Sequence, residues 1–250
     1  MKKAVFASDF DRTLYFYSRD PQITEEDIYA VRKFQRNGFL FGLNTGRSFK
    51  TVPPALNGAV EPDFYATCSG AYILDKDLKQ IHKEVMDRDL FIELCREYRD
   101  SGVLIVHACD ETWLNAPGFV TSRHFDYPEE IEGDVNGVSV RTDEAFELAE
   151  KVRKKYGDLV SVFPNRNVLD ITVHGCSKGS SIAVLKEYYH ADIIFAAGDD
   201  WNDIPQIRAA DVGFAFTWSD EEIRKSAAYV VDSLKQALDI AERIASESAK

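Results

Sequence analysis

Short apolar runs that end in polar residues mark the N-terminal part of the chain. Ala4–Ser8 has the pattern of a buried strand, and residues 39–43 have the pattern of a second one. Between them, Thr24 begins a capping-box pattern and Gly38 is typical of a helix end, which predicts a helix with its buried face at Ile28, Val31 and Phe34. This strand–helix–strand order predicts a parallel α/β sheet with a right-handed crossover.

The same order returns near the C-terminus. Residues 180–189 have the pattern of a helix, and the apolar runs Ile193–Ala197 and Val212–Phe216 each have the pattern of a buried strand. Helical patterns at 221–228 and 234–245 follow these strands. The two ends of the chain therefore predict one α/β core of the Rossmann-like type.

The middle of the chain has a different pattern, in which strands are separated by short turns. Two hairpins are predicted, one from 103–107 with 112–115 and one from 159–163 with Val168–Val173. A further strand is predicted at 138–141, and helices are predicted at 89–99 and Ala145–Tyr156. The second hairpin is predicted to turn at Pro164 and Asn165. We therefore expect an α+β unit at 83–175, inserted into a core made of 1–82 and 176–250.

Polar clusters follow three of the predicted core strands. They are DFDRT at 9–13, NTGR at 44–47 and GDDWND at 198–203. In open α/β sheets, ligands bind just beyond the carboxyl ends of the strands, so these clusters mark a candidate site. If the strands are neighbours, five carboxylates converge, those of Asp9, Asp11, Asp199, Asp200 and Asp203. Carboxylates that close need a cation, and a few oxygen ligands completed by water and phosphate favour Mg²⁺ over Ca²⁺.

Composition narrows the class of partner. The formal net charge of -12 repels polyanions, so neither nucleic acid nor an anionic membrane surface is expected to bind. The first apolar run is too short for a signal peptide, and no run has the length of a bilayer span. No CxxC pair occurs among the cysteines, which favours a reduced, cytoplasmic protein; they are Cys68, Cys95, Cys109 and Cys176.

Lys178 lies at the start of a predicted helix, directly after the N-cap candidate Ser177. A cation at this end opposes the helix dipole at a cost of about 0.3–1 kcal/mol when exposed. A nearby anion would offset that cost, whereas a solvated surface lysine would need no such partner. Taken alone, Lys178 favours the interpretation as a solvated surface lysine.

These motifs, in this order, resemble the haloacid dehalogenase (HAD) superfamily, in particular its Cof-type sugar-phosphatase branch with a C2B-type cap. The resemblance rests on DFDRT at 9–13, TGR at 45–47, KG at 178–179 and GDDWND at 198–203. Further similarity at SGA (69–71) and Val212–Phe216 extends it over nearly the whole chain. The inserted unit would then be a cap domain over the core.

The resemblance implies a Mg²⁺-dependent phosphatase that acts on small-molecule phosphate monoesters, sugar phosphates among them, through an aspartyl phosphate. Asp9 would be the nucleophile, and Asp11 the general acid and base. The metal ligands would be Asp9, Asp199 and the backbone carbonyl of Asp11. Asp203 would contact these ligands without binding the metal itself. The phosphoryl oxygens would be held by Thr45, Lys178, Asn202 and the backbone amides of Phe10 and Gly46. Arg47 would contact the substrate or the cap, or form a surface ion pair.

Three positions depart from the usual pattern of the superfamily. Arg12 stands where glycine is usual, and a left-handed backbone there would cost roughly 1–2 kcal/mol. Ser69 replaces an asparagine and Asn44 replaces an alanine. None of the three changes removes a catalytic group.

The sequence leaves the substrate and the oligomeric state open. Candidates for reading a leaving group from the cap are Trp113, Asn115, His124, Asn165 and Arg166. A sugar phosphomutase of the same branch is one alternative function. A phosphoacceptor signalling domain is another, although such a module needs neither a large insertion nor Asp11.

Overall fold

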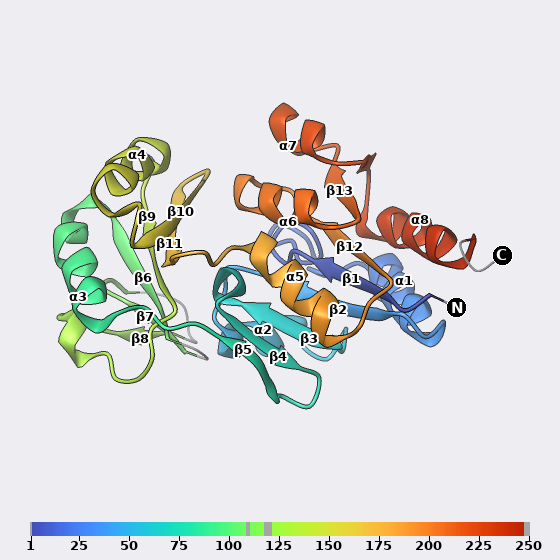
Figure 1. Ribbon diagram of the computed structural model, residues 1–250, viewed down its shortest axis with the longest axis horizontal. Helices are drawn as coiled ribbons and strands as arrows, with labels where there is room; N and C mark the ends of the chain where they lie inside the picture. The colour runs from blue at the N-terminus through green and yellow to red at the C-terminus, as the bar shows by residue number, and fades with distance from the viewer. Residues whose placement is uncertain (1, 109–110, 118–121, 248–250) are drawn as a thin grey trace.

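The structure is a computed structural model that describes residues 2–108, 111–117 and 122–247. Two sheets lie side by side, and both described ends of the chain are in the part built on the larger one (Figure 1). The larger sheet has the order β14-β13-β12-β1-β2-β3-β4-β5. Its strands are β1 (Ala4–Ser8), β2 (Leu40–Asn44), β3 (Phe64–Thr67), β4 (Tyr72–Asp75), β5 (Gln80–Lys83), β12 (Ile193–Ala197), β13 (Val212–Phe216) and β14 (Tyr229–Val231).

The larger sheet is parallel from β14 to β3, and β4 and β5 continue it as antiparallel strands. Phe6 on β1 faces an apolar cluster that contains α1 (Glu25–Arg36) and α8 (Leu234–Glu247). Val5 faces the opposite cluster, which contains α5 (Lys178–Tyr188). Both faces of the sheet are therefore covered, which explains why its central strands β1, β2 and β12 are almost entirely apolar. The α/β class predicted from the sequence is confirmed.

Shorter elements complete the larger sheet's surroundings. They are α2 (Val52–Leu56), α6 (Ile204–Ala209), α7 (Glu221–Ser226) and short 3₁₀ turns, one of which is Trp201–Asp203. Helix α1 begins as predicted, because the Thr24 side chain accepts a hydrogen bond from the backbone N–H of Asp27. It ends before Gly38, whose φ of 84° suits a glycine.

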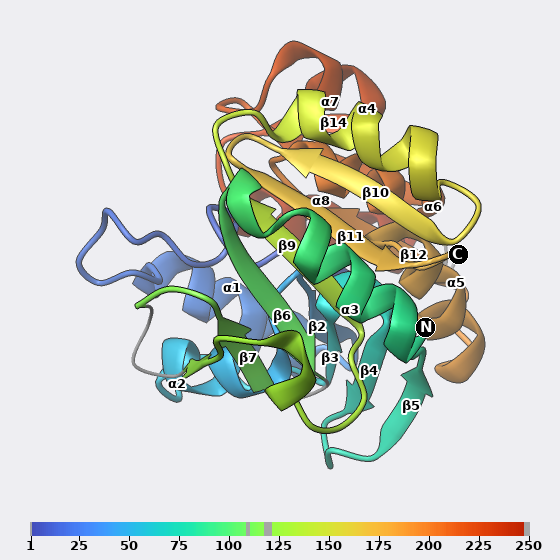
Figure 2. The same cartoon turned by 90° about the vertical axis from the view of Figure 1, so that its left-hand side faces the viewer.

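The smaller sheet has the order β10-β11-β9-β6-β7-β8. Its strands are β6 (Val103–Ala108), β7 (Glu111–Leu114), β8 (Arg123–His124), β9 (Gly137–Arg141), β10 (Val160–Asn165) and β11 (Val168–Val173). Helices α3 (Arg88–Glu97) and α4 (Ala145–Tyr156) cover the face turned away from the larger sheet (Figure 2). The other face is turned toward the larger sheet.

Alternation along the strands of the smaller sheet separates an apolar face from a polar one. Val106 on β6, Val140 on β9 and Leu169 on β11 are buried in the cluster that includes α3 and α4. The neighbouring positions in the sequence carry His107, Ser139 and Asp170. Because successive side chains of a strand point to opposite faces, these polar groups are on the side of the larger sheet.

Two details of the smaller sheet differ from the prediction. Pro164 is not in the turn of the second hairpin but inside β10, where it pairs with Leu169. Strand β10 is an edge strand, so a residue without an N–H is tolerated there. In addition, β8 runs parallel to β7 in an otherwise antiparallel sheet.

Cys68, Cys95 and Cys176 are buried and form no disulfide among the described residues, and Cys109 lies outside those residues. Within the ranges that the structure covers, no helix is both long and apolar enough to cross a membrane.

Candidate active site

Strands β12, β1 and β2 are neighbours, so the polar residues that follow them meet at one edge of the larger sheet. Asp9 follows β1, Thr45 follows β2 and Asp199 lies just beyond β12. All three are buried. They open into a cavity of about 880 Å³ that lies between the two sheets and is lined by residues from both. The meeting of the three clusters is what the strand-end argument predicted.

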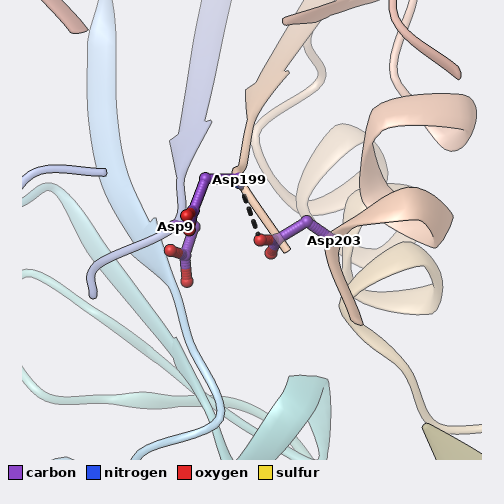
Figure 3. Close-up of side chains that lie close together, drawn as sticks. All are labelled: Asp9, Asp199 and Asp203. Carbon is purple, nitrogen blue, oxygen red and sulfur yellow. Dashed lines mark hydrogen bonds between the residues drawn. The ribbon is translucent and has the colours of Figure 1, made fainter. Parts of the chain in front are cut away.

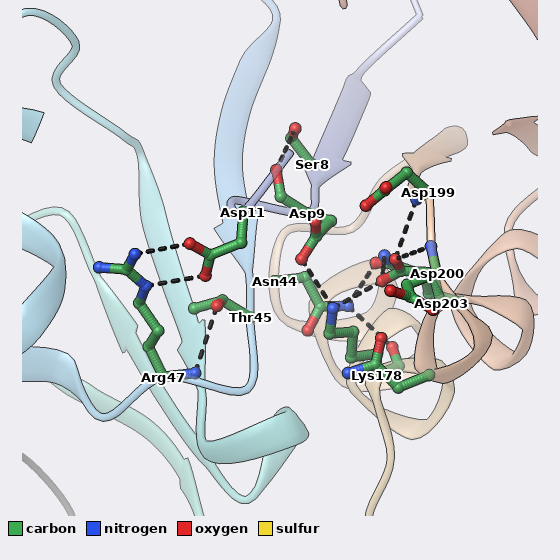
Figure 4. A network of polar contacts seen from close by, with 12 residues as sticks. Ser8, Asp9, Asp11, Asn44, Thr45, Arg47, Lys178, Asp199, Asp200 and Asp203 are labelled. Carbon is green, nitrogen blue, oxygen red and sulfur yellow. Dashed lines mark hydrogen bonds and ion pairs between the residues drawn. The ribbon is translucent and has the colours of Figure 1, made fainter. Parts of the chain in front are cut away.

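Lys178 is the first residue of α5 and connects two acidic residues of the site. Its Nζ lies 2.7 Å from Asp9 Oδ1 and 2.6 Å from Asp203 Oδ1 (Figure 4). The side chain is only 3% exposed, and burial alone would lower its pKa, but Asp203 and Asp9 raise the pKa above its ordinary value. Lys178 is therefore a buried cation with two carboxylate partners, and the surface alternative is wrong.

The start of α5 is built to hold Lys178 in place. Ser177 and Ser180 form a capping box in which each side chain bonds the other's backbone N–H. Asn44 at the end of β2 donates a hydrogen bond of 2.8 Å to the backbone carbonyl of Lys178. The helix begins at Lys178, two residues before the sequence pattern indicated, because the apolar periodicity starts only after the cap.

Asp203 has both carboxylate oxygens occupied. Its Oδ1 accepts hydrogen bonds from Lys178 and from Gln206 at 2.6 and 2.8 Å. Its Oδ2 accepts the backbone N–H groups of Asp199 and Asp200, both at 3.0 Å. Asp203 therefore fixes the loop after β12 and orients Lys178.

Carboxylate oxygens of Asp9, Asp199 and Asp203 lie within 4.8 Å of one another and could hold a metal ion (Figure 3). Since the oxygens of Asp203 are already used, we assign the metal-binding capacity to Asp9 and Asp199. Asp199 Oδ2 is buried and has no hydrogen-bond partner. A buried carboxylate oxygen without a donor is costly unless a cation occupies the space beside it.

The electrostatics of the two carboxyl groups fit a cation-binding site. Burial, with repulsion from Asp203 next, raises the pKa of Asp199 to about 7. The same two causes raise the pKa of Asp9 well above its ordinary value, against the opposing effect of Lys178. Hard oxygen donors of this kind fit Mg²⁺.

Arg12 is the nearest described cation to the free oxygen of Asp199, at 3.4 Å from its Nη2. Its backbone is left-handed, with a φ of 64°, at the position where the superfamily usually has glycine. The strain expected from the sequence is therefore present, and the ion pair with Asp199 offsets part of it. The unusual arginine in the sequence was the only signal of this contact.

Asp11 does not join the carboxylate cluster. Its two oxygens accept hydrogen bonds from Arg47, 2.8 Å from Nε and 2.6 Å from Nη2, in a bidentate pair (Figure 4). The guanidinium also lies over the ring of Phe10, at 4.7 Å from its centre, and bonds the hydroxyl of Tyr17. The structure thus brings Arg47 to Asp11, one of the contacts that the sequence had left open.

The remaining predicted residues border the same space. Thr45 Oγ1 accepts a hydrogen bond of 3.2 Å from the backbone N–H of Arg47, and Gly46 lines the cavity beside it. Asn202 also lines the cavity, and its side-chain amide donates to Asp170 of the smaller sheet at 3.2 Å. Asp200 faces the smaller sheet too, where it accepts a hydrogen bond from Arg166 at 2.8 Å.

The candidates for reading a leaving group fall into two sets. Trp113, Asn115 and His124 are not among the residues that line the cavity, whereas Asn165 is. Arg166 forms the ion pair with Asp200 described above.

The polar wall on the side of the smaller sheet is formed instead by residues that the sequence reasoning missed, His107, Ser139, Arg141 and Asp170. The signal for them was present in the period-two alternation of β6, β9 and β11. What the alternation does not indicate is which face of that sheet meets the larger one.

Comparison with known proteins agrees with this architecture. Residues 6–239 match the family described as haloacid dehalogenase-like hydrolase. The chain is 23% identical over 236 residues to the 5-amino-6-(5-phospho-D-ribitylamino)uracil phosphatase YcsE of Bacillus subtilis, covering 92% of this chain and 90% of that protein.

Two solved structures have a similar fold. The sugar phosphatase BT4131, described as HAD subclass IIB, matches with a TM-score of 0.81 at 19% identity, covering 98% of this chain and 99% of the other. The HAD phosphatase BT1666 of Bacteroides thetaiotaomicron matches with a TM-score of 0.79 at 22% identity, covering 96% and 95%. With the family match extending over both sheets, the chain belongs to the haloacid dehalogenase-like hydrolases and has the fold of that superfamily's phosphatases.

Proposed function

We propose that the protein is a Mg²⁺-dependent phosphatase that hydrolyses phosphate monoesters of small soluble molecules, sugar phosphates among them, through an aspartyl phosphate on Asp9. One observation carries the proposal. The buried carboxylate of Asp9 lines a cavity close to the ammonium of Lys178 and to the carboxylate of Asp199, whose Oδ2 accepts no hydrogen bond. A nucleophile, a fixed cation and a metal-binding oxygen are the parts that phosphoryl transfer to an aspartate needs.

In this proposal Asp9 attacks phosphorus in line and forms an acyl phosphate, while the alcohol leaves. Lys178 holds Asp9 in position and offsets charge on the phosphoryl oxygens. Thr45, Asn202 and the backbone N–H groups of Phe10 and Gly46 complete the binding of those oxygens. Mg²⁺, held by Asp9, Asp199 and the backbone carbonyl of Asp11, would neutralise negative charge on the transferred phosphoryl group.

Asp11 is proposed as the general acid that protonates the leaving oxygen and then as the base that activates water. Its carboxylate faces Arg47 rather than Asp9 in this structure. Asp11 must therefore turn from Arg47 toward the substrate during the reaction. The ion pair with Arg47 would then keep the Asp11 carboxylate away from the reaction site until the substrate is bound.

We further propose that residues 83–175 form a cap domain on a catalytic core of 1–82 and 176–250. Contacts across the cavity support a closed arrangement of the two parts. His107 bonds Ser48 at 3.0 Å, and Arg166 bonds Asp200 at 2.8 Å. A cap in this position would exclude bulk water and read the leaving group. The described cysteines are buried and form no disulfide with one another, which agrees with the cytoplasmic location that we propose.

Release of phosphate from a panel of phosphate monoesters tests the proposal. The panel should include hexose phosphates, ribitol 5-phosphate and nitrophenyl phosphate, since the named activity of one relative concerns a phosphorylated ribityl compound. We expect turnover with Mg²⁺, none in excess chelator, and poor replacement by Ca²⁺, whose larger and looser shell misplaces the reacting groups. Asp9→Asn protein is the control for contaminating phosphatases. Full activity in excess chelator, or in the Asp9→Asn variant, would contradict the proposal.

A further inference from the structure

A chain of hydrogen bonds crosses the cavity wall from the larger sheet to the smaller one and ends at Asp170. Ser48 Oγ lies 3.0 Å from His107 Nδ1, and His107 Nε2 lies 2.9 Å from Ser139 Oγ. Ser139 then donates a hydrogen bond of 2.6 Å to Asp170 Oδ1. His107, Ser139 and Asp170 come from β6, β9 and β11, which are adjacent in the sheet.

The last step of this chain fixes the direction of the bond before it, and the neutral state of His107 fixes the direction of the first bond. A hydroxyl has one proton, and Ser139 gives its proton to Asp170, so His107 Nε2 must be the donor to Ser139. Burial lowers the pKa of His107, although Asp170 acts in the opposite direction, so the ring is neutral and Nδ1 accepts from Ser48. All the protons in the chain therefore point toward Asp170, which is its terminal acceptor.

Asp170 has acceptor capacity beyond these contacts. Its Oδ1 accepts from Ser139, and its Oδ2 accepts from the side-chain amide of Asn202 at 3.2 Å. A carboxylate offers about four lone-pair sites, so about two remain. The side chain is 7% exposed and lines the cavity, and among the described residues it forms no ion pair with lysine or arginine. It is thus a buried carboxylate that lines the cavity and has acceptor sites left over.

Asp170 lies close to two residues that are proposed to bind the phosphoryl group of the substrate. A Cβ placed on Gly46 would lie 3.7 Å from Asp170 Oδ2, and Asn202 bonds the same oxygen. Gly46 and Asn202 are both proposed contacts of the phosphoryl group. Asp170 therefore lies beside two of the residues proposed to bind the phosphate, where the adjoining part of a bound substrate would be.

We propose that Asp170, oriented by Ser139 and His107, determines specificity by selecting leaving alcohols that carry a neutral hydrogen-bond donor, such as a hydroxyl, close to the phosphoester. The same carboxylate rejects leaving groups that carry an anion there, because two negative charges in a partly dry cavity repel each other strongly. The substrate class is then neutral polyol and sugar phosphates, and not phosphorylated acids. This inference rests on the proposed phosphatase function and adds the choice of substrate to it.

Three matched three-carbon esters provide the test. Glycerol 3-phosphate carries two neutral hydroxyl donors, propyl phosphate carries none, and 3-phosphoglycerate keeps the hydroxyl next to the phosphoester carbon but carries a carboxylate in place of the other. We expect kcat/KM of the wild-type protein to be highest for glycerol 3-phosphate. In Asp170→Asn, the ratio of 3-phosphoglycerate to glycerol 3-phosphate should rise about tenfold or more, as expected for removing one charge from a partly buried site. In Asp170→Ala, the ratio of glycerol 3-phosphate to propyl phosphate should fall toward one.

These readouts are ratios, so a general loss of activity cancels in them, and a purely structural role of Asp170 would leave both unchanged. Ser139→Ala keeps the carboxylate but removes its anchor, and we expect a smaller shift in the same direction. It also provides the test if the Asp170 variants do not fold. Asp158→Asn, a change at an exposed residue that does not line the cavity, should leave both ratios at the wild-type values. Ratios within twofold of wild type in the folded Asp170 variants, or in Ser139→Ala if those do not fold, would overturn the inference.

Binding provides a second readout that does not depend on turnover. Calorimetry on Asp9→Asn protein should show tighter binding of glycerol 3-phosphate than of 3-phosphoglycerate, and the additional change Asp170→Asn should remove that preference. If the wild-type protein hydrolyses no ester, the phosphatase proposal fails while the binding preference still decides the role of Asp170. If hydrolysis occurs and neither readout depends on residue 170, only the present inference fails.

Discussion

Asp199 is the residue whose charge the proposed metal ion would affect most directly. Its Oδ2 is buried without a hydrogen-bond donor, and burial followed by repulsion from Asp203 raises its pKa to about 7. The folded-state pKa thus lies above the unfolded one, so the metal-free folded protein binds a proton that the unfolded chain has released. The contribution of this group to stability is full at low pH and decreases as the pH rises toward 7. The pKa of Asp9 is shifted in the same direction.

The raised pKa of Asp199 predicts that stabilisation of the protein by Mg²⁺ depends on pH. Below pH 6 protons compete for the site, so added Mg²⁺ should raise Tm only slightly. At pH 8 the carboxyl group of Asp199 is above its pKa and deprotonated, so the increase in Tm should be several degrees larger. Thermal unfolding at the two pH values, with and without Mg²⁺, measures the difference. Asp199→Asn should lose most of the Mg²⁺ effect at pH 8, and an equal effect at both pH values would argue against this site.

Residue identity alone indicated the acidic cluster, but it did not indicate which carboxylate oxygens already accept hydrogen bonds. Asp9, Asp199 and Asp203 share a motif-like appearance in the sequence, yet only the fold shows that Asp203 has both oxygens occupied. Likewise, Arg12 was visible as an exception to the superfamily pattern. Its proximity to Asp199 depends on the neighbouring strands β1 and β12, which the local sequence does not encode.

At the scale of elements, the hydrophobic pattern predicted helices and strands correctly where a segment is buried along a regular face. Strands β1, β12 and β13 and helix α4 have the predicted bounds, because their apolar residues follow a clear period and a polar residue or glycine ends them. Strands β3, β4 and β5 were not predicted. They are short and only partly apolar, and the sheet forms them through pairing with β2 and with one another.

The hairpin of β10 and β11 illustrates how an edge position changes the meaning of a residue. Pro164 followed by Asn165 is a common turn signal, so the turn was predicted there. In the structure both residues belong to β10, and the turn follows at Arg166 and Asn167. Because β10 has a neighbour on one side only, a proline costs it little, and sequence alone does not distinguish an edge strand from a turn.

The whole molecule has separate apolar clusters for its two sheets. The clusters around the larger sheet contain residues from 4–73 and 182–245, whereas the cluster of the smaller sheet contains residues from 86–171. The cavity lies between these two parts and takes its walls from both. This division could be predicted from the change of pattern along the chain. The residues that meet across the cavity could not, because they depend on how the two sheets dock.

Removing the proposed cap should therefore separate chemistry from selectivity. Deletion of 83–175 with the ends joined should leave a core that cleaves nitrophenyl phosphate weakly, because Asp9, Lys178 and Asp199 all belong to the larger sheet's part. Discrimination among sugar phosphates should collapse, since the wall at Asp170 is lost. Relative kcat/KM values over the panel, measured on protein shown to be folded by circular dichroism, provide the test. Unchanged substrate ratios would mean that this segment does not read the substrate.

Phosphate transfer to Asp9 is the central step of the proposed mechanism, and the resulting phosphoenzyme should be observable in Asp11→Asn protein. Nitrophenolate leaves without acid assistance, so the first step should survive, while water attack on the acyl phosphate should become slow because it needs a base. Rapid-quench measurement with nitrophenyl phosphate and Mg²⁺ should show a burst of about one equivalent of nitrophenolate per enzyme, then slow turnover. The phosphate should be on the peptide that contains Asp9 and be released by hydroxylamine. Absence of a burst, or a phosphate located on any other residue, would contradict the mechanism.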